Sequence, residues 1–465
     1  MLDLTRTRDL HTQLAEVAAA DPGRFAAATD TAQQALRAGQ ANFERSRAMP
    51  AAVSALALEQ EGVAQLAAIS ESLHAIVERA LDWVLADEGR LLRYFGEHQR
   101  LFPYLGQRTP GLDTWQGYSR YDAVVTDVGE VKIIELNTCC PAGFCHGEIF
   151  SAAVQPALAM LDLDADVGET FGTIPQTALI EELLAVEQAA GLEPNLIGLV
   201  NDENGLENEL ELFAGLFAER GREAVIAPAA ELGFRNGQLQ LAGRTLSLTY
   251  NKIRISTADS PNHNWAAGFE QRYAGFLEAL ASGTVVSVNN LTAATIAENK
   301  VLLTVLADET FAAELSPSER QLVADHVLWT VPLADGKTTR NGETINLLPY
   351  VRAHREQLVI KPANEGRGFR VVVGKFATAE QWDAACQIRD DLPCVVQEYA
   401  ESVRLPVVAP RQDEAAAIFA VQPMYLTLAL GIIRGRYRGL FSRVSPEPIT
   451  NVGRAGLVQA VFVSR

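Results

Sequence analysis

The sequence contains few cysteines, and their placement excludes several kinds of chemistry. Five occur in 465 residues: Cys139, Cys140, Cys145, Cys386 and Cys394. An odd, scattered set does not suit a disulfide framework, so we expect reduced thiols. The neighbours Cys145 and His146 could indicate a zinc ligand pair or a thiol nucleophile. However, no second Cys/His pair follows at zinc-finger spacing, so thiol or zinc chemistry is disfavoured.

Long apolar runs are also missing. No stretch approaches the roughly 18 to 20 apolar residues of a membrane-spanning helix, and the first 25 residues lack the apolar centre of a signal peptide. The formal net charge of −19 disfavours nucleic acids and anionic membranes, which attract basic surfaces. We therefore expect a cytoplasmic protein with no nucleic-acid or membrane partner. The sequence leaves open whether it forms a homodimer.

The usual phosphate-binding fingerprints are absent as well. There is no G-x-x-x-x-G-K-[ST] loop, and "EGRGFR" lacks the third glycine and the helix start of a dinucleotide-binding fold. A P-loop or Rossmann enzyme is therefore not expected. The composition, with 48% hydrophobic and 21% charged residues, is that of a globular protein long enough for roughly two or three lobes.

The pattern of apolar residues changes along the chain. In residues 1–110, Ala and Leu recur at helical spacing on both sides of Pro50, which predicts a helical region. Residues 111–290 hold a predicted hairpin and alternating helices and strands, typical of a parallel α/β unit over 175–290. Residues 291–465 contain a strand, a glycine-containing loop, a helix and further strands. The predicted fold class is α/β, with separate α+β lobes.

The predicted hairpin places like charges together. Its strands, "YDAVV" and "VKIIEL", are joined by "TDVGE", and a turn at Val128 and Gly129 sets Asp122 opposite Glu135. Opposed like charges destabilise a strand pair, and Asn137 falls on the same face by alternation. One interpretation is a solvated acidic edge. The other is a site for Mg²⁺, which binds such oxygen ligands and leaves positions to water and phosphate.

Lysine is scarce, which draws attention to two of its positions. Lys361 ends the apolar strand "LVIK", and Lys300 lies where two helical stretches join. A compact ammonium group suits a phosphate, although each side chain could instead extend to solvent. The loop after Lys361 could offer backbone N–H groups to a phosphate through Asn364, Glu365, Gly366, Arg367 and Gly368.

A third segment could contact a nucleotide. The strand "VVQEYA" ends with Gln397, Glu398 and Tyr399, about thirty residues after the glycine loop. Backbone groups here could bond an adenine edge, although polar residues at a strand end are often merely solvated. The same uncertainty applies to the roles of "HNW" at 263–265 and "YNKIR" at 250–254, which we expect to shape the substrate pocket together with the N-terminal region.

Together, these residues resemble an ATP-grasp ligase of the circularly permuted type related to glutathionylspermidine synthase. That family carries R-x-D on one hairpin strand and E-x-N on the next, matched here by Arg120, Asp122, Glu135 and Asn137. The resemblance implies that the acidic and amide members bind magnesium. It also implies that Arg120 lies against the reacting acyl phosphate.

Other motifs extend the resemblance over residues 115–465. "ENK" with Lys300 and "IKP" with Lys361 resemble the family's two nucleotide lysines, "EGRG" its phosphate-covering loop and "QEY" its adenine hinge. "ELNTCCPAG" also resembles the E-x-N-T-x-P-G strand of D-alanine:D-alanine ligases. Arg443 is a second catalytic candidate and Asn451 a lesser one, because the family keeps such residues near its C-terminal strands. A surface salt bridge is the alternative for Arg443.

The resemblance implies an ATP-dependent carboxylate–amine ligase that uses ATP and one or two Mg²⁺ ions. Its substrates would be a small carboxylate and a small amine, both amino-acid-like, and a γ-glutamyl bond is one form of the product. The chain lacks the amidase domain of glutathionylspermidine synthase, carries "NTCCPAG" where that enzyme has N-A-D-T-P, and adds the N-terminal region. A polyamine acceptor, a phosphotransferase and a non-catalytic nucleotide-binding regulator are the alternatives.

Overall fold

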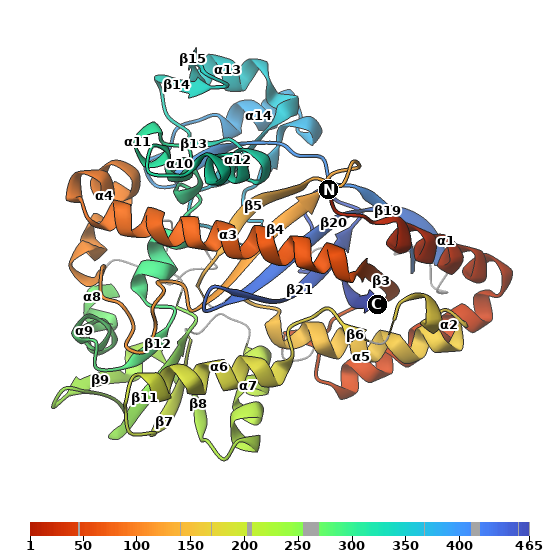
Figure 1. The fold of residues 1–465 in the computed structure, drawn as a ribbon, viewed down its shortest axis with the longest axis horizontal. Coiled ribbons are helices and arrows are strands. Elements are labelled where there is room, and N and C mark those ends of the chain that lie inside the picture. The colour runs from red at the N-terminus through yellow and green to blue at the C-terminus, as the bar shows by residue number, and fades with distance from the viewer. Residues whose placement is uncertain are drawn as a thin grey trace.

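The described residues form three larger β-sheets, two two-stranded ribbons and flanking helices (Figure 1). The computed structural model describes residues 1–44, 47–139, 141–168, 170–201, 207–253, 269–366, 368–410, 419–453 and 455–464. A large central sheet lies between two smaller lobes, each with a sheet of its own. Within the described residues, no helix combines the length and the apolar character that crossing a bilayer requires.

The central sheet joins distant parts of the chain. Its eight strands have the order β3-β22-β21-β20-β4-β5, while β19 pairs with β20 and β6 with β22. The predicted hairpin, β4 and β5, therefore lies beside the C-terminal strand β20. The bounds are β3 (Ala51–Glu59), β4 (Tyr118–Val125), β5 (Val131–Asn137), β6 (Thr170–Phe171), β19 (Arg404–Pro410), β20 (Phe419–Ile433), β21 (Arg436–Ser445) and β22 (Leu457–Ser464).

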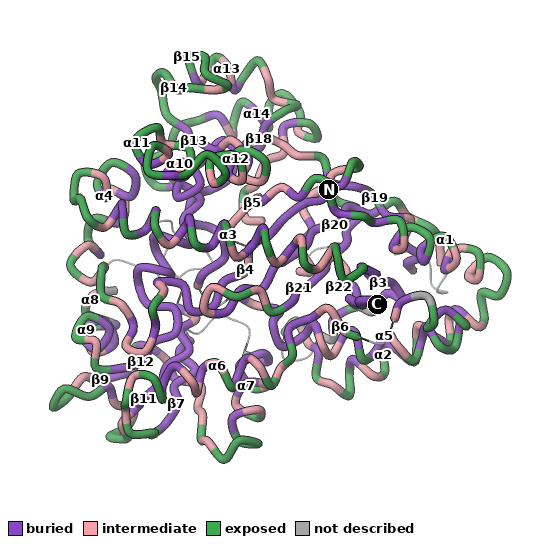
Figure 2. The backbone as a smooth tube through the Cα atoms, in the orientation of Figure 1, coloured by how far each residue is buried: buried purple, intermediate pink, exposed green. Residues whose placement is uncertain are grey.

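Helices cover both faces of this sheet. The long helix α3 (Gln60–Leu85) crosses one face, and α1 (Thr5–Ala20), α2 (Pro22–Ala38) and α5 (Phe144–Met160) pack on the other (Figure 1). Two separate hydrophobic cores result, and Figure 2 shows the strands between them as buried. The remaining elements before β4 are β1 (Asn42–Glu44), β2 (Arg47–Ala48), α4 (Glu88–Phe95) and the 3₁₀ helix η1 (Gly96–Tyr104).

Strand β3 corrects the prediction that residues 1–110 are helical. It pairs in parallel with β22, and its side chains alternate between the two cores, with Leu56 and Leu58 in one and Ala55 and Ala57 in the other. A parallel strand buried on both faces is a nearly continuous apolar run. Its sequence therefore lacks the alternation of a half-buried strand, and its alanines and leucines match helical spacing equally well.

One of the two smaller lobes, called the second lobe below, confirms the parallel unit predicted for residues 175–290. Strands β8, β7, β11 and β12 pair in parallel, and β9 and β10 extend the sheet as antiparallel strands. The bounds are α6 (Gln176–Ala189), β7 (Leu196–Asn201), α7 (Glu207–Glu219), β8 (Ala224–Pro228), β9 (Leu232–Arg235), β10 (Gln238–Leu241), β11 (Arg244–Asn251), α8 (Phe269–Arg272), α9 (Ala274–Ser282) and β12 (Val286–Val288).

The third lobe holds the two predicted nucleotide lysines. Its antiparallel sheet has the order β13-β18-β16-β17, and β14 and β15 form a separate ribbon. The bounds are η4 (Ala293–Ala297), α10 (Leu302–Leu306), α11 (Glu309–Ala312), α12 (Pro317–His326), β13 (Thr330–Pro332), β14 (Lys337–Arg340), β15 (Glu343–Asn346), α13 (Leu347–Ala353), β16 (Leu358–Pro362), β17 (Val372–Val373), α14 (Ala379–Ala385) and β18 (Cys394–Glu398).

Candidate active site

The hairpin has the predicted pairing at its functional end. Asp122 faces Glu135 and Arg120 faces Asn137, so the four side chains share one face of the sheet. The turn differs from the prediction. Val125 pairs with Val131, and the Thr126 N–H donates to Glu130 O at 2.9 Å, so the three residues 127–129 remain in the loop instead of two. A bulge between the turn and Asp122 absorbs this extra residue and restores the register.

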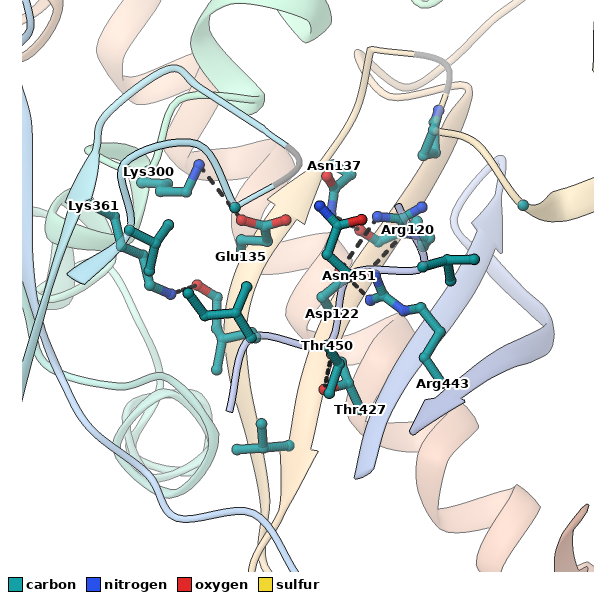
Figure 3. A pocket seen from close by; sticks show the side chains of 18 of the residues that line it. Arg120, Asp122, Glu135, Asn137, Lys300, Lys361, Thr427, Arg443, Thr450 and Asn451 are labelled. Atoms are coloured by element: carbon teal, nitrogen blue, oxygen red, sulfur yellow. Dashed lines mark hydrogen bonds and ion pairs between the residues drawn. The ribbon is translucent and has the colours of Figure 1, made fainter. Parts of the chain in front are cut away.

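A cavity of about 340 Å³ lies where the hairpin, the third lobe and the C-terminal strands meet (Figure 3). Its size is within the range of small-molecule sites. Most of the predicted site residues line it: Arg120, Asp122, Glu135, Asn137, Lys300, Lys361, Glu365, Gly368, Gln397, Glu398, Tyr399, Arg443 and Asn451. Gly366 is not among the lining residues, and Arg367 lies outside the described residues.

Two arginines hold the Asp122 carboxylate. Arg120 contacts it through Nε at 2.8 Å and Nη2 at 3.2 Å, and Arg443 Nη2 lies 2.6 Å from Oδ2. Asp122 is 3% exposed, so the solvated-edge interpretation is wrong for this residue, and Arg443 does not form a surface salt bridge. In this structure, guanidinium groups offset the charge that Asp122 would otherwise present to Glu135.

The surrounding charges also act on Arg120. Burial by itself lowers the pKa of this guanidinium, but the Asp122 carboxylate and the more distant Glu135 and Glu298 carboxylates raise it, and the net shift is upward. Arg120 Nη1 donates a 2.6 Å hydrogen bond to Ala142 O in the loop that follows β5. The arginine is therefore charged and fixed in position at the wall of the cavity.

Both predicted nucleotide lysines reach β5 from the third lobe. Lys300 Nζ lies 3.5 Å from Glu135 Oε2 and donates a 2.7 Å hydrogen bond to Glu365 O. Lys361 Nζ donates to Gln397 Oε1 at 2.7 Å and to Ile134 O at 3.3 Å. Both side chains are buried, so neither extends to bulk solvent as the alternative interpretation required.

The two ammonium groups repel each other. Burial lowers the pKa of Lys361, the Glu135 carboxylate partly opposes this effect and Lys300 adds to it, and the resulting pKa is about 8. Two buried cations side by side are stabilised by an anion that binds between them. This end of the cavity therefore suits a phosphate chain.

The expected adenine hinge is occupied in part by sheet contacts. The backbone N–H of Glu398 donates to Trp329 O at 2.9 Å, and that of Tyr399 donates to Gln357 O at 2.8 Å. A backbone donor for an adenine edge would therefore come from another residue, and Ala400 also lines the cavity. The sequence predicted that residues 397–399 lie at the site, but it could not predict that the backbone N–H groups of Glu398 and Tyr399 are used within the protein.

Glu298 is a lining residue that we did not predict from the sequence. Its carboxylate accepts hydrogen bonds from the backbone N–H groups of Thr138 and, at 2.9 Å, Cys139. These contacts anchor the loop that follows β5 against the third lobe. The feature of the sequence that could have identified Glu298 is its position in the "ENK" motif, two residues before Lys300.

A buried ion pair lies near the start of α5, beside the cavity. Lys252 Nζ lies 2.8 Å from Glu209 Oε2, and the N–H of Gly143 donates to Glu209 Oε1 at 2.8 Å. His146 and Lys252 line the cavity here. Cys145 does not, and burial raises the pKa of its thiol well above the ordinary value, so it is not a nucleophile.

Some of the residues named from the sequence fall outside the described residues. Cys140, Arg254 of "YNKIR" and the whole of "HNW" belong to this group. Within the described part of the chain, no three His, Cys, Asp or Glu side chains are grouped to hold a metal ion. The predicted magnesium ligands Asp122, Glu135 and Asn137 are two carboxylates and one amide, so they do not count as a group of three such side chains.

The hairpin residues fit a hard cation. The carboxylate of Glu135 and the amide of Asn137 line the cavity from the same strand face, and Asn137 Nδ2 donates to Arg120 O at 3.3 Å. This hydrogen bond uses the amide nitrogen of Asn137, so its amide oxygen is the atom that could bind a cation. Oxygen donors with open positions for water and phosphate are typical of Mg²⁺ sites.

Comparisons with known proteins give a structural match. A glutathione synthetase-like effector from Globodera pallida is similar with a TM-score of 0.58 and 10% sequence identity, over 94% of this chain and 96% of that chain. The chain shares the mixed α/β fold of this effector. This confirms the predicted fold class, and the hairpin precedes the lysine strands in sequence, as a permuted order requires.

Other comparisons add no argument. A RimK-domain ATP-grasp protein from Sphaerobacter thermophilus matches with 15% identity over 57% of this chain and 89% of that chain, but its TM-score is 0.26. No family model and no curated protein matches the sequence.

Proposed function

We propose that the protein is an ATP-dependent ligase that joins a carboxylate to an amine and releases ADP and phosphate. The observation that carries the proposal is the meeting of two lysines and an acid at β5. Lys300 Nζ lies 3.5 Å from Glu135 Oε2, and Lys361 Nζ donates to the adjacent Ile134 O. A magnesium–nucleotide complex is bound by cationic side chains that contact its phosphates and by nearby oxygen atoms that contact its metal ion.

The proposed roles follow from these positions. ATP with one or two Mg²⁺ ions would supply the phosphoryl group that activates the carboxylate as an acyl phosphate. Lys300 and Lys361 would bind phosphate oxygens, and Glu135 and Asn137 would bind the metal. Tyr399 and its neighbours would contact the base.

Arg120 and Arg443 would stabilise the negative charge that develops at the reacting carbonyl. Loss of one such donor typically lowers the rate about 10²- to 10³-fold. Asp122 orients both guanidinium groups through its short contacts. In this proposal, Asp122 becomes a third metal ligand only where one arginine moves away from it.

We further propose amino-acid-like substrates, with a γ-glutamyl compound as one candidate product. The cavity supports this choice because both basic and acidic side chains line it. Arg120, Arg443 and Lys252 can contact carboxylates, and Glu135 and Glu298 can contact ammonium groups or the metal. A polyamine acceptor is the competing choice for the amine.

The test is a matrix of amino acids and amines, including polyamines, incubated with ATP and Mg²⁺. Phosphate release and the mass of the condensed product would identify the active pair. Hydroxylamine added to the acid alone should give a hydroxamate, because it traps an acyl phosphate. A phosphorylated product that gives no hydroxamate would indicate a phosphotransferase, and nucleotide binding without turnover would indicate a regulator.

A further inference from the structure

His146, at the start of α5, is a buried polar side chain of the cavity that the proposed roles above do not use. It is 3% exposed and lines the cavity, yet neither of its ring nitrogens has a hydrogen-bond partner among the described residues. A buried polar group without a hydrogen-bond partner destabilises a folded protein. A polar group that enters the cavity can supply the missing partner.

A carboxylate stands behind this imidazole. Glu209 Oε1 lies 3.9 Å from His146 Nδ1, too far for a hydrogen bond but close enough to stabilise a positive charge. Burial raises the pKa of Glu209, but Lys252 and His146 lower it, as does the hydrogen bond from Gly143, and the net shift is downward. Glu209 is therefore ionised at neutral pH.

The imidazole itself is uncharged in the free protein. Burial lowers the pKa of His146 and Lys252 lowers it further, while the Glu209 carboxylate partly opposes them. An uncharged imidazole has a lone pair that can accept a proton. The Glu209 carboxylate then stabilises the imidazolium that forms.

We propose that His146 accepts the proton that the amine substrate must lose when the amide bond forms. This role rests on the proposed ligase function. The amine nitrogen attacks the carbonyl carbon of the acyl phosphate, its proton passes to the imidazole, and the C–O bond to phosphate breaks with its electron pair on the phosphate. The imidazolium then releases the proton to water. A weak base is sufficient, because the nitrogen becomes far more acidic once the C–N bond has formed.

A second histidine provides a matched control. His74 is also 3% exposed, its Nε2 lies 3.8 Å from Glu78 Oε1, and this nitrogen has no hydrogen-bond partner in the described part of the chain. However, His74 belongs to α3 and is not among the lining residues of the cavity. The two histidines share burial and a nearby carboxylate, and differ in access to the cavity.

The experiment compares His146→Gln and His74→Gln with two amines. The most active acid is paired with its amino acid or amine acceptor from the matrix above, and separately with hydroxylamine, which is uncharged at neutral pH and a strong nucleophile. For His146→Gln we expect hydroxamate formation within about threefold of the original protein and amide formation about 10²-fold slower. His74→Gln should change neither rate. Equal losses of both products, or an unchanged amide rate, would overturn the role.

Two further measurements separate folding and function from this role. If His146→Gln does not fold, as judged by thermal unfolding, His146→Asn replaces it. In the original protein, the ratio of amide to hydroxamate, at constant uncharged amine, should fall at acid pH, below the ordinary pKa of an imidazole, as His146 is protonated beside Glu209 of α7 and Lys252 after β11. A flat ratio would overturn the role alone. No hydroxamate with any acid would overturn the ligase function and the role of His146 with it.

Discussion

Lys361 donates a 2.7 Å hydrogen bond to Gln397 Oε1 across the neighbouring strands β16 and β18. Gln397 in turn donates through Nε2 to Thr330 Oγ1 at 3.0 Å. The glutamine predicted to contact the nucleotide therefore holds a lysine in position, while the lysine faces the cavity. The nucleotide affinity should depend on the protonation of this lysine.

The first prediction concerns the pH dependence of ATP binding. The pKa of Lys361 in the free protein is about 8, and bound phosphate favours the charged form. Binding above pH 8 must therefore take up a proton, and the affinity should fall about tenfold for each pH unit. Calorimetry from pH 7 to pH 9, in two buffers with different ionisation enthalpies, measures both the affinity for ATP and the number of protons taken up on binding. Lys361→Arg should remove the dependence, and an affinity of the original protein that does not change with pH would contradict this explanation.

A second prediction concerns Glu135. Glu135→Ala should remain folded, because this side chain is 23% exposed and Lys300 keeps its hydrogen bond to Glu365 O. The loss of the ion pair with the buried Lys300 should nevertheless lower the free energy of unfolding. The substitution should lower carboxylate-stimulated ADP formation at least about 10²-fold, since a metal ligand is lost. Glu130→Ala is the control, because Glu130 lies near the turn of the same hairpin and its half-exposed side chain pairs with Lys132 Nζ at 3.5 Å. Full activity of Glu135→Ala would remove the hairpin from the site.

Asp122 should contribute strongly to stability as well as to activity. Asp122→Ala leaves Arg120 and Arg443 as buried charges without their carboxylate, and the free energy of unfolding should fall by about 3–5 kcal/mol. Urea unfolding measures this change. Glu223→Ala removes the exposed pair with Arg244 and should have no measurable effect. Similar results for the two variants would show that the arginines find other partners.

Gly143 should resist substitution because of its backbone. Its φ is +101°, a conformation that side chains disfavour, and an added Cβ would lie 3.4 Å from the ring of Phe441. Gly143→Ala should therefore destabilise the protein by about 1–2 kcal/mol in urea unfolding. Gly215→Ala is the control, since Gly215 lies within α7 with open space around it. This substitution should raise the free energy of unfolding by up to about 1 kcal/mol. An unchanged unfolding midpoint for Gly143→Ala would show that the loop adapts.

The sequence was most informative where structure is local. The alternation in "YDAVV" and "VKIIEL" predicted the hairpin and the pairing of Asp122 with Glu135, and the structure confirms both. The turn was one residue too short in the prediction, and the bulge at Ile134 compensated for the error. A bulge has no distinctive sequence in an apolar strand, so only the structure locates it.

Contacts between distant segments could not be predicted in this way. Arg443 reaches Asp122 across 321 residues of sequence, and no local pattern relates the two. Strand β3 was predicted as helix because its partner β22 lies at the other end of the chain. Its parallel pairing and the burial of both faces override the helical spacing of its alanines and leucines.

The order of strands in the central sheet also constrains when the site can form during synthesis. Strands β4 and β5 leave the ribosome early, but their neighbour β20 follows nearly 300 residues later, as the difference between residues 419 and 125 shows. Until then, one edge of the hairpin has no partner, and Asp122 lacks Arg443. Until β20 is made, the nascent chain therefore exposes an unpaired strand edge and the Asp122 carboxylate, and an unpaired strand edge is a site where partly folded chains aggregate.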